Sequence, residues 1–150
     1  MGQSLVQTYV HLVFSTKHRK PLIIPPFEDE LHNYLGGVCN ELDCQSIIVG
    51  GYTDHIHMLY KQSQKIALMK LVEEVKKRSS KWIKEKHPLL SNFYWQNGYA
   101  AFSVDPQKMD GLIHYIANQH EHHSKNDVQN ELRNMLIEHF VEFDERYLWD

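Results

Sequence analysis

The order of the elements that the sequence predicts, β-α-β-β-α-β followed by two helices, is that of an α+β domain with a ferredoxin-like (RRM-like) fold. Two long amphipathic segments, residues 27–42 and 65–86, alternate with strand-like segments, and Gly50-Gly51 separates two of the strands as a hairpin turn. Such a fold has an antiparallel four-stranded sheet with the first two helices on one face. Because this fold hosts many functions, the function has to be argued from the site.

The first part of the chain contains three predicted strands and one predicted helix. Residues 6–15 alternate in polarity and are rich in β-branched and aromatic side chains, which indicates a strand. Residues 27–42 repeat apolar side chains at helical spacing and indicate an amphipathic helix. Residues 44–50 and 54–61 are the expected second and third strands, joined through the glycine pair.

The second part begins with a long helix, residues 65–86, whose lysines lie on the face opposite its apolar side chains. Residues 94–104 are aromatic and β-prone and predict the fourth strand. Asp105 is an N-cap and the proline after it suits the first helical position, so a helix is expected from there to about His123. A last helix is expected over residues 127–139, with three apolar side chains facing inward: Val128, Leu132 and Leu136.

Composition favours one globular domain over residues 1–150, because 42% of the 150 residues are hydrophobic and 23% are charged. No stretch approaches the roughly 18 consecutive apolar residues of a membrane helix. Two cysteines, Cys39 and Cys44, without a CxxC pattern indicate free thiols in a reducing compartment.

The net charge is −3, but the charges are unevenly distributed. Residues 61–86 hold nine Lys/Arg against three Asp/Glu, and residues 121–150 hold three Lys/Arg against eight Asp/Glu. A basic face beside an acidic end is typical of a nucleic-acid-binding domain, and a solvated helix face is the alternative.

Histidine is frequent, with 11 residues, and it forms two H-x-H triplets. In the first, His55 and His57 lie two apart on a predicted strand, so both imidazoles project from the same face and can hold two positions on a metal ion. The second triplet, residues 120–122, falls on a predicted helix, where residues two apart are separated by about 200° and cannot share a metal. A partly buried histidine pair remains the alternative interpretation of the strand triplet.

Tyr115 and Gln119 lie four residues apart on the predicted penultimate helix and therefore on one face. Tyr115 falls on the flank of the apolar face and not at its centre. The residues of this helix fall into two stripes. The stripe expected to face a core consists of Met109, Leu112, Ile113, Ile116 and His120. The other stripe consists of Lys108, Gly111, Tyr115, Gln119 and His122. A tyrosine that only borders the core is the alternative.

These residues together resemble the single-tyrosine transposases of the HUH nuclease superfamily. Within that superfamily, the resemblance is to the small bacterial insertion-sequence transposases of the IS-two-hundred and six-hundred-five group. The superfamily is named after two histidines that flank one bulky apolar residue, here His55, Ile56 and His57. The group places a tyrosine nucleophile on a downstream helix and a glutamine four residues later, which Tyr115 and Gln119 match. Further similarity covers nearly the whole chain and includes residues 11–19, 95–104, 115–123 and 144–147.

The resemblance implies phosphoryl transfer on single-stranded DNA, with Tyr115 as the catalytic nucleophile and a divalent metal ion, Mg or Mn, held by His55, His57 and Gln119. Because these ligands are neutral, they leave the charge of the ion for the substrate. Imidazole suits manganese better than magnesium, so we expect activity with either ion and tighter binding of manganese. The resemblance also implies a 5′-phosphotyrosine intermediate and a free 3′-hydroxyl. Asp54 is expected to point to the opposite face by strand alternation and is given no catalytic role.

The partners that the resemblance implies are single-stranded DNA with a hairpin and a second copy of the chain. In this homodimer the tyrosine helix of one subunit would serve the histidines of the other, with Gly111 as a candidate flexible point. The expected location is the bacterial cytoplasm, with nucleoid association when DNA is bound.

Phosphate contacts are expected from two basic sets: Lys17, Arg19 and Lys20 after the first strand, and Lys70, Lys77, Lys81 and Lys84 on the long helix. Unpaired bases would stack on Trp95, Tyr99 or Phe102, for which core packing is the alternative.

Three other functions remain open. A domesticated endonuclease would cut and join repeat hairpins of its host by the same chemistry. A non-catalytic ferredoxin-like nucleic-acid-binding module would keep its function after Tyr115→Phe. A metal-dependent hydrolase of small phosphate esters would use water as the nucleophile and form no covalent DNA adduct.

Overall fold

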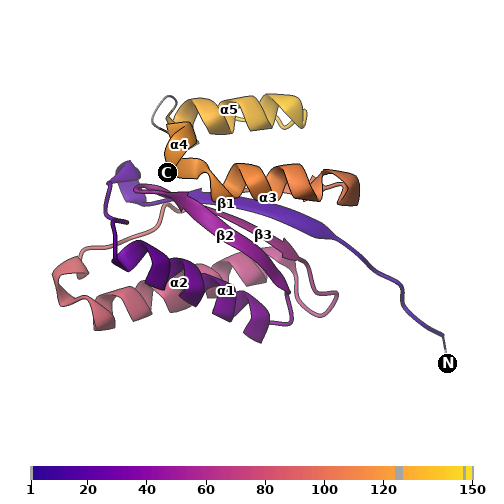
Figure 1. The fold of residues 1–150 in the computed structure, drawn as a ribbon, viewed down its shortest axis with the longest axis horizontal. Helices are drawn as coiled ribbons and strands as arrows, with labels where there is room; N and C mark the ends of the chain where they lie inside the picture. The colour runs from indigo at the N-terminus through magenta and orange to yellow at the C-terminus, as the bar shows by residue number, and fades with distance from the viewer. Residues whose placement is uncertain (1, 124–126, 147, 150) are drawn as a thin grey trace.

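A four-stranded antiparallel sheet lies between two layers of helices (Figure 1). The computed structural model describes residues 2–123, 127–146 and 148–149. The strands, in the spatial order β2-β3-β1-β4, are β1 (Tyr9–Ser15), β2 (Ser46–Tyr52), β3 (His55–Lys61) and β4 (Ala100–Val104). One face carries α1 (Phe27–Glu41) and α2 (Leu68–Lys86), and the other carries α3 (Met109–Ala117), α4 (Gln119–His123) and α5 (Val128–Glu138). This arrangement confirms the predicted ferredoxin-like α+β fold with additional C-terminal helices.

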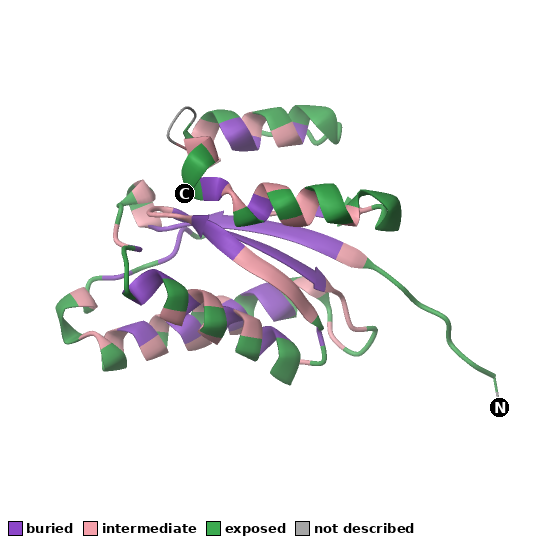
Figure 2. Ribbon diagram, in the orientation of Figure 1, coloured by how far each residue is buried: buried purple, intermediate pink, exposed green. Residues whose placement is uncertain are grey.

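The main hydrophobic core lies between the sheet and the layer of α1 and α2. Alternate residues of the two central strands, among them Leu12 and Phe14 of β1 and Ile56 and Met58 of β3, point into this core and are almost fully buried. The central strands are buried along most of their length, and the exposed positions lie on the helices, the loops and the N-terminal segment (Figure 2). The residues between these core positions therefore face α3, α4 and α5.

The β2–β3 hairpin turns at residues 53–54, so the prediction of a turn at Gly50-Gly51 is wrong. Both glycines are paired in the sheet, Gly50 with His57 and Gly51 with Ile56. A β-carbon at Gly50 would lie 2.6 Å from the carbonyl oxygen of Ile116, so this glycine allows α3 to approach the sheet closely. The glycine pair thus marks a packing contact of the strand instead of its end.

The helix expected to run to His123 is interrupted at Asn118, whose backbone N–H closes α3 on the carbonyls of His114 and Tyr115. After this break, α4 begins at Gln119 and runs in a different direction from α3 (Figure 1). His120 is consequently exposed and pairs with Glu28 of α1 at 2.7 Å, which corrects the expectation that it faces a core. Ile116 is buried as expected.

The last helix agrees with its prediction. The Asp127 side chain accepts a hydrogen bond from the backbone N–H of Asn130 at 2.8 Å, and the three inward residues, Val128, Leu132 and Leu136, are buried. The fourth strand is shorter than predicted, because residues 94–99 contribute only an isolated bridge between Trp95 and Thr16. In the described part of the chain, each helix is too short or too polar to cross a membrane.

Candidate active site

The imidazoles of His55 and His57 project together from β3 toward α3, α4 and α5, as strand alternation predicts. Both residues are fully buried. His11 on the neighbouring strand β1 lies beside them, with its Nε2 atom 2.7 Å from His57 Nδ1. A neutral His57 ring carries one proton: on Nε2 it is donated to Glu131, and on Nδ1 it is donated to His11, which leaves the Nε2 lone pair for a metal ion. Burial is the main cause that lowers the pKa of His11 and of His57; the charge of His57 adds to the effect on His11, and the charges of His55 and His123 add to the effect on His57.

Asp54 orients His55. It lies in the hairpin turn and not on the strand, so alternation does not apply to it, and its Oδ1 atom is 2.8 Å from His55 Nδ1. Because an ionised carboxylate only accepts hydrogen bonds, Nδ1 must donate, and the neutral ring then keeps a lone pair on Nε2. The expectation that Asp54 points away from the histidines is therefore wrong, and its role is to fix the tautomer of His55.

Gln119 completes the trio expected from the sequence. The break at Asn118 turns its buried side chain toward the sheet, where Gln119 Oε1 lies 3.0 Å from His55 Nε2. Both atoms carry lone pairs in the tautomer that Asp54 selects, and a shared cation satisfies such a pair. The structure thus brings His55, His57 and Gln119 into one cluster with donors suited to a divalent ion.

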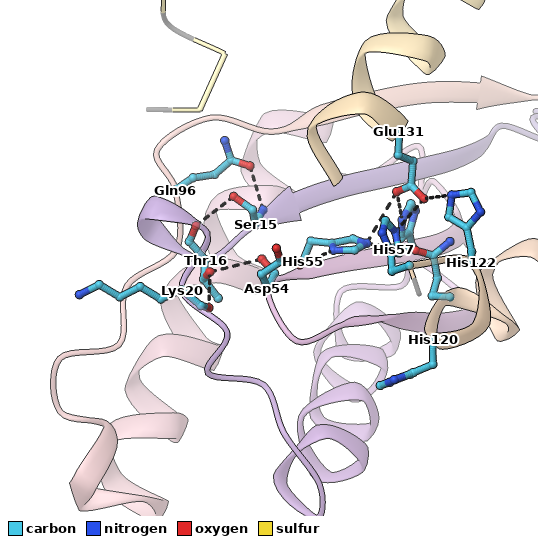
Figure 3. Close-up of polar contacts among 12 residues, drawn as sticks. Ser15, Thr16, Lys20, Asp54, His55, His57, Gln96, His120, His122 and Glu131 are labelled. Atoms are coloured by element: carbon cyan, nitrogen blue, oxygen red, sulfur yellow. Dashed lines mark hydrogen bonds and ion pairs between the residues drawn. The ribbon is translucent and has the colours of Figure 1, made fainter. Parts of the chain in front are cut away.

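Glu131 of α5 lies at the centre of the site, although the sequence patterns described above do not single it out (Figure 3). Its carboxylate is 2.8 Å from His57 Nε2, 2.9 Å from His123 Nε2 and 3.1 Å from His122 Nε2. Its side chain is only 3% exposed. Burial acts to raise the pKa of Glu131, but the hydrogen bonds from His123, His57 and Tyr115 outweigh it and hold that pKa well below its usual range.

Tyr115 is half-buried on α3, and its hydroxyl donates a hydrogen bond to Glu131 Oε2. The phenol ring stands edge-on to the His57 ring, with 5.8 Å between the ring centroids. Burial and the adjacent Glu131 charge raise the pKa of Tyr115 far above its ordinary value. The phenol is therefore neutral here, and it opens on a pocket of about 310 Å³ between α3 and α5, which Glu131, Asn134 and His139 also line.

His55, His57, His123 and Glu131 offer ligand atoms that all lie within 4.8 Å of one another, so this group could hold a metal ion. The conclusion that His120 and His122 cannot share a metal is consistent with the structure, because His120 turns to Glu28 while His122 turns to Glu131. The sequence held one signal for Glu131, an acidic residue adjoining the inward stripe of an amphipathic helix.

The two predicted basic sets lie in different layers. Lys17 and Arg19 belong to a short 3-10 helix (Lys17–Arg19) directly after β1, and Lys20 follows it. Thr16 fixes this segment beside the histidines, because its hydroxyl donates to the Lys20 carbonyl at 2.8 Å and its backbone N–H donates to the Asp54 carbonyl at 2.9 Å (Figure 3).

The lysines of α2 lie in the layer that covers the opposite face of the sheet (Figure 1). Lys70 and Lys77 form ion pairs with Glu74, and Lys84 stacks over the Tyr94 ring at 4.0 Å. Lys81 is exposed on the same helix.

The three candidate base-stacking residues divide into two groups. Trp95 and Phe102 are buried at 7% and 4% exposure, which supports the core-packing alternative for both. Tyr99 is 40% exposed, with Lys76 Nζ 5.8 Å from its ring centroid, so part of its side chain remains accessible for stacking.

Comparisons with known proteins place this chain in a family. The family model described as "Transposase IS200 like" matches residues 4–119, so the chain belongs to the IS200-like transposase family. No curated protein matches the chain significantly. The match ends at Gln119, and the His122, His123 and Glu131 positions therefore lie beyond it.

Two solved structures share the fold. A candidate transposase from Deinococcus radiodurans R1, solved at 1.90 Å resolution, superposes with a TM-score of 0.66 at 19% identity, over 79% of this chain and 96% of that chain. A REP-associated tyrosine transposase bound to a REP hairpin superposes with a TM-score of 0.61 at 12% identity, over 82% of this chain and 73% of that chain. At these identities the likeness concerns the fold alone.

Proposed function

We propose that this chain, acting as a single domain over residues 1–150, is a metal-dependent tyrosine transposase that cuts and rejoins single-stranded DNA beside hairpins. The observation that carries this proposal is the position of Tyr115, which lines a pocket and donates its hydroxyl proton to Glu131, a carboxylate that also contacts the buried histidines. Covalent transfer of a phosphoryl group needs a nucleophile and positive charge at the same phosphate. Membership of a transposase family supports the same reaction.

The donors fit a divalent ion held by His55, His57 and Gln119, because the geometry around His55 leaves lone pairs on Nε2 and on Gln119 Oε1 facing each other at 3.0 Å. Such an ion, magnesium or manganese, supplies polarisation of the scissile phosphate and offsets the charge that develops on it. Asp54 keeps His55 in the tautomer that binding requires.

In the proposed step, Tyr115 Oη forms a bond to phosphorus while the bond between phosphorus and the 3′-oxygen breaks. The phenol proton ends on that oxygen, which becomes a free 3′-hydroxyl, and the 5′-phosphate stays on the tyrosine. One phosphodiester replaces another, so attack by a later 3′-hydroxyl rejoins DNA without an external energy source. The raised pKa of Tyr115 keeps the nucleophile neutral until the site is loaded.

DNA with a hairpin is the proposed substrate. The fold shared with a REP-associated transposase bound to a REP hairpin supports this choice. The basic segment of Lys17, Arg19 and Lys20 is tied to the turn that holds Asp54, so it is placed to contact phosphates near the nucleophile. We propose a homodimer in the bacterial cytoplasm, associated with the nucleoid when DNA is bound.

Covalent capture tests this function. The protein is mixed with manganese and a pool of single-stranded, hairpin-bearing oligonucleotides, and the products are separated on a denaturing gel. We expect a protein–DNA band that Tyr115→Phe abolishes, while Tyr94→Phe, which removes an exposed hydroxyl near α2, leaves it intact.

The other outcomes identify the alternatives. Trapped strands that derive from dispersed host repeats, and not from the ends of a mobile element, would indicate a domesticated endonuclease. DNA binding without an adduct would indicate a non-catalytic module. Phosphate-ester hydrolysis that survives Tyr115→Phe would indicate a hydrolase with a water nucleophile.

A further inference from the structure

One carboxylate joins the two halves of the candidate site. Glu131 Oε1 faces the strand histidines, at 2.8 Å from His57 Nε2 and 3.6 Å from His55 Nε2. Glu131 Oε2 faces the other side, where it accepts hydrogen bonds from the Tyr115 hydroxyl and from His123 Nε2. The same side chain therefore contacts the expected metal ligands and the expected nucleophile.

Hydrogen bonds do not account for every contact of Oε1. His55 Nδ1 donates to Asp54, and His55 Nε2 faces Gln119 Oε1 at 3.0 Å and Glu131 Oε1 at 3.6 Å. The second distance is too long for a hydrogen bond. Three electron-rich atoms thus converge on one region that is shielded from solvent, and such a convergence favours a cation between them.

The chemistry of the donor set points the same way. Two imidazoles and an amide supply a single oxygen, whereas magnesium and manganese prefer several oxygen ligands. Glu131 would add a carboxylate oxygen, which either ion prefers, at 2.8 Å from His57 Nε2 and 3.6 Å from His55 Nε2. Its place on α5 lies outside the segment that matches the family model, residues 4–119.

We propose that Glu131 is a further ligand of the metal ion, bound through Oε1, so that α5 closes the metal site and holds Tyr115 beside it. This inference rests on the proposed metal-dependent function and extends the ligand set beyond His55, His57 and Gln119. His123 holds Oε2 from the side opposite Oε1 and so orients the carboxylate.

Manganese affinity in the absence of DNA tests the inference. The free ion is quantified by electron paramagnetic resonance during titration of the wild-type protein and of Glu131→Gln, which preserves the shape of the side chain. We expect Glu131→Gln to bind manganese about 10- to 100-fold more weakly. Glu85→Gln, an exposed position on α2, should bind as the wild type does.

Wild-type affinity in Glu131→Gln, or no manganese binding by the wild type, would overturn the inference. The covalent DNA adduct tests the proposed function separately. An adduct on Tyr115, together with unchanged metal affinity in Glu131→Gln, would support the transposase function and contradict only the role of Glu131 as a ligand.

A second measurement needs no variant and therefore does not depend on how Glu131→Gln folds. Zinc, which is diamagnetic, is titrated into the carbon-13-labelled wild-type protein, and the assigned side-chain carboxyl resonance of Glu131 is followed by nuclear magnetic resonance. We expect this resonance to shift as the zinc site fills, while that of Glu85 stays in place. A Glu131 resonance that does not move at full zinc occupancy contradicts the proposal.

Discussion

Gly50 of β2 and Ile116 of α3 approach so closely that a β-carbon on Gly50 would lie 2.6 Å from the Ile116 carbonyl oxygen and 2.8 Å from its side chain. Ile116 directly follows Tyr115, so this contact sets the height of the tyrosine helix above the sheet. Gly50 is also paired with His57 in the neighbouring strand. The absence of one side chain therefore determines how near Tyr115 comes to the histidines.

Gly50→Ala should consequently push α3 away from β2. The atoms that a new methyl group would meet belong mainly to backbone, which yields little, so we expect a loss of about 1–3 kcal/mol in the free energy of unfolding. The adduct yield should fall as well, because Tyr115 moves with the helix. Gly37→Ala is the matched control, since nothing lies within 4 Å of its β-carbon and alanine favours helix α1. Urea unfolding and the denaturing gel check both effects, and equal behaviour of the two variants would contradict the account.

Asp54→Ala should weaken metal binding without removing a ligand. The variant frees His55 to place its proton on either ring nitrogen, so part of the population no longer offers Nε2. We expect manganese affinity to fall about 10-fold or more, as for other residues that orient a histidine ligand. Asp29→Ala, on the exposed side of α1, serves as the control. Unchanged affinity in the titration would show that Asp54 does not govern the tautomer.

Local patterns predicted the parts of the site that lie within one element. Alternation along β3 placed His55 and His57 on one face, and the Asp127 cap with its inward apolar stripe located α5. Both signals arise from backbone geometry, which operates over a few residues.

Contacts between distant elements were not predictable in the same way. The roles of Gly50 and Glu131 depend on where α3 and α5 dock, and a glycine pair or a lone acidic residue has the same local pattern in a turn or on a surface. The break at Asn118, which aims Gln119 at His55, likewise follows from tertiary packing, since no glycine or proline between residues 112 and 123 marks it in the sequence.

The metal-free protein should lose stability as the pH falls below about 6.5, the ordinary pKa of histidine. Burial lowers the folded-state pKa of His11 and His57, so below pH 6.5 the unfolded chain binds more protons than the folded chain. The free energy of unfolding therefore rises with pH through this window and falls as acid is added. The lowered pKa of Glu131 acts in the same direction only below about 4.5, its ordinary value, and does not contribute here.

Urea unfolding in the presence of a chelator at pH 7 and pH 5 measures the effect, which we expect to be about 1–3 kcal/mol. His11→Gln removes one of the two buried rings and should flatten the profile. A free energy of unfolding that does not change between the two pH values would contradict the burial of neutral histidines.

The two basic sets should differ in their effect on DNA binding. Lys17 and Lys20 are held near His55 through Thr16, whereas Lys70 and Lys77 lie on the opposite layer and already pair with Glu74. We expect Lys17→Gln with Lys20→Gln to weaken binding of single-stranded DNA and to reduce its salt dependence, by about 0.7 in the logarithmic slope for each phosphate that is no longer neutralised. Lys70→Gln with Lys77→Gln should change the slope less. Fluorescence anisotropy at several salt concentrations checks this, and the reverse ranking would place the DNA on α2.

A mixed sample of two inactive variants distinguishes a site built within one chain from a site shared between subunits. His57→Ala and Tyr115→Phe chains are co-expressed, with a mass tag on one of them, and the denaturing gel shows which chain carries DNA. Because Tyr115, Glu131 and His57 form one continuous set of contacts inside a single chain, we expect no recovery of the adduct. Recovery on the His57→Ala chain, which retains Tyr115, would instead establish exchange of the tyrosine helix between subunits. In that case the contact of Gly50 with Ile116 would have to form between chains. Gly50→Ala, introduced into the Tyr115→Phe chain, which keeps its histidines, would then abolish the recovered adduct.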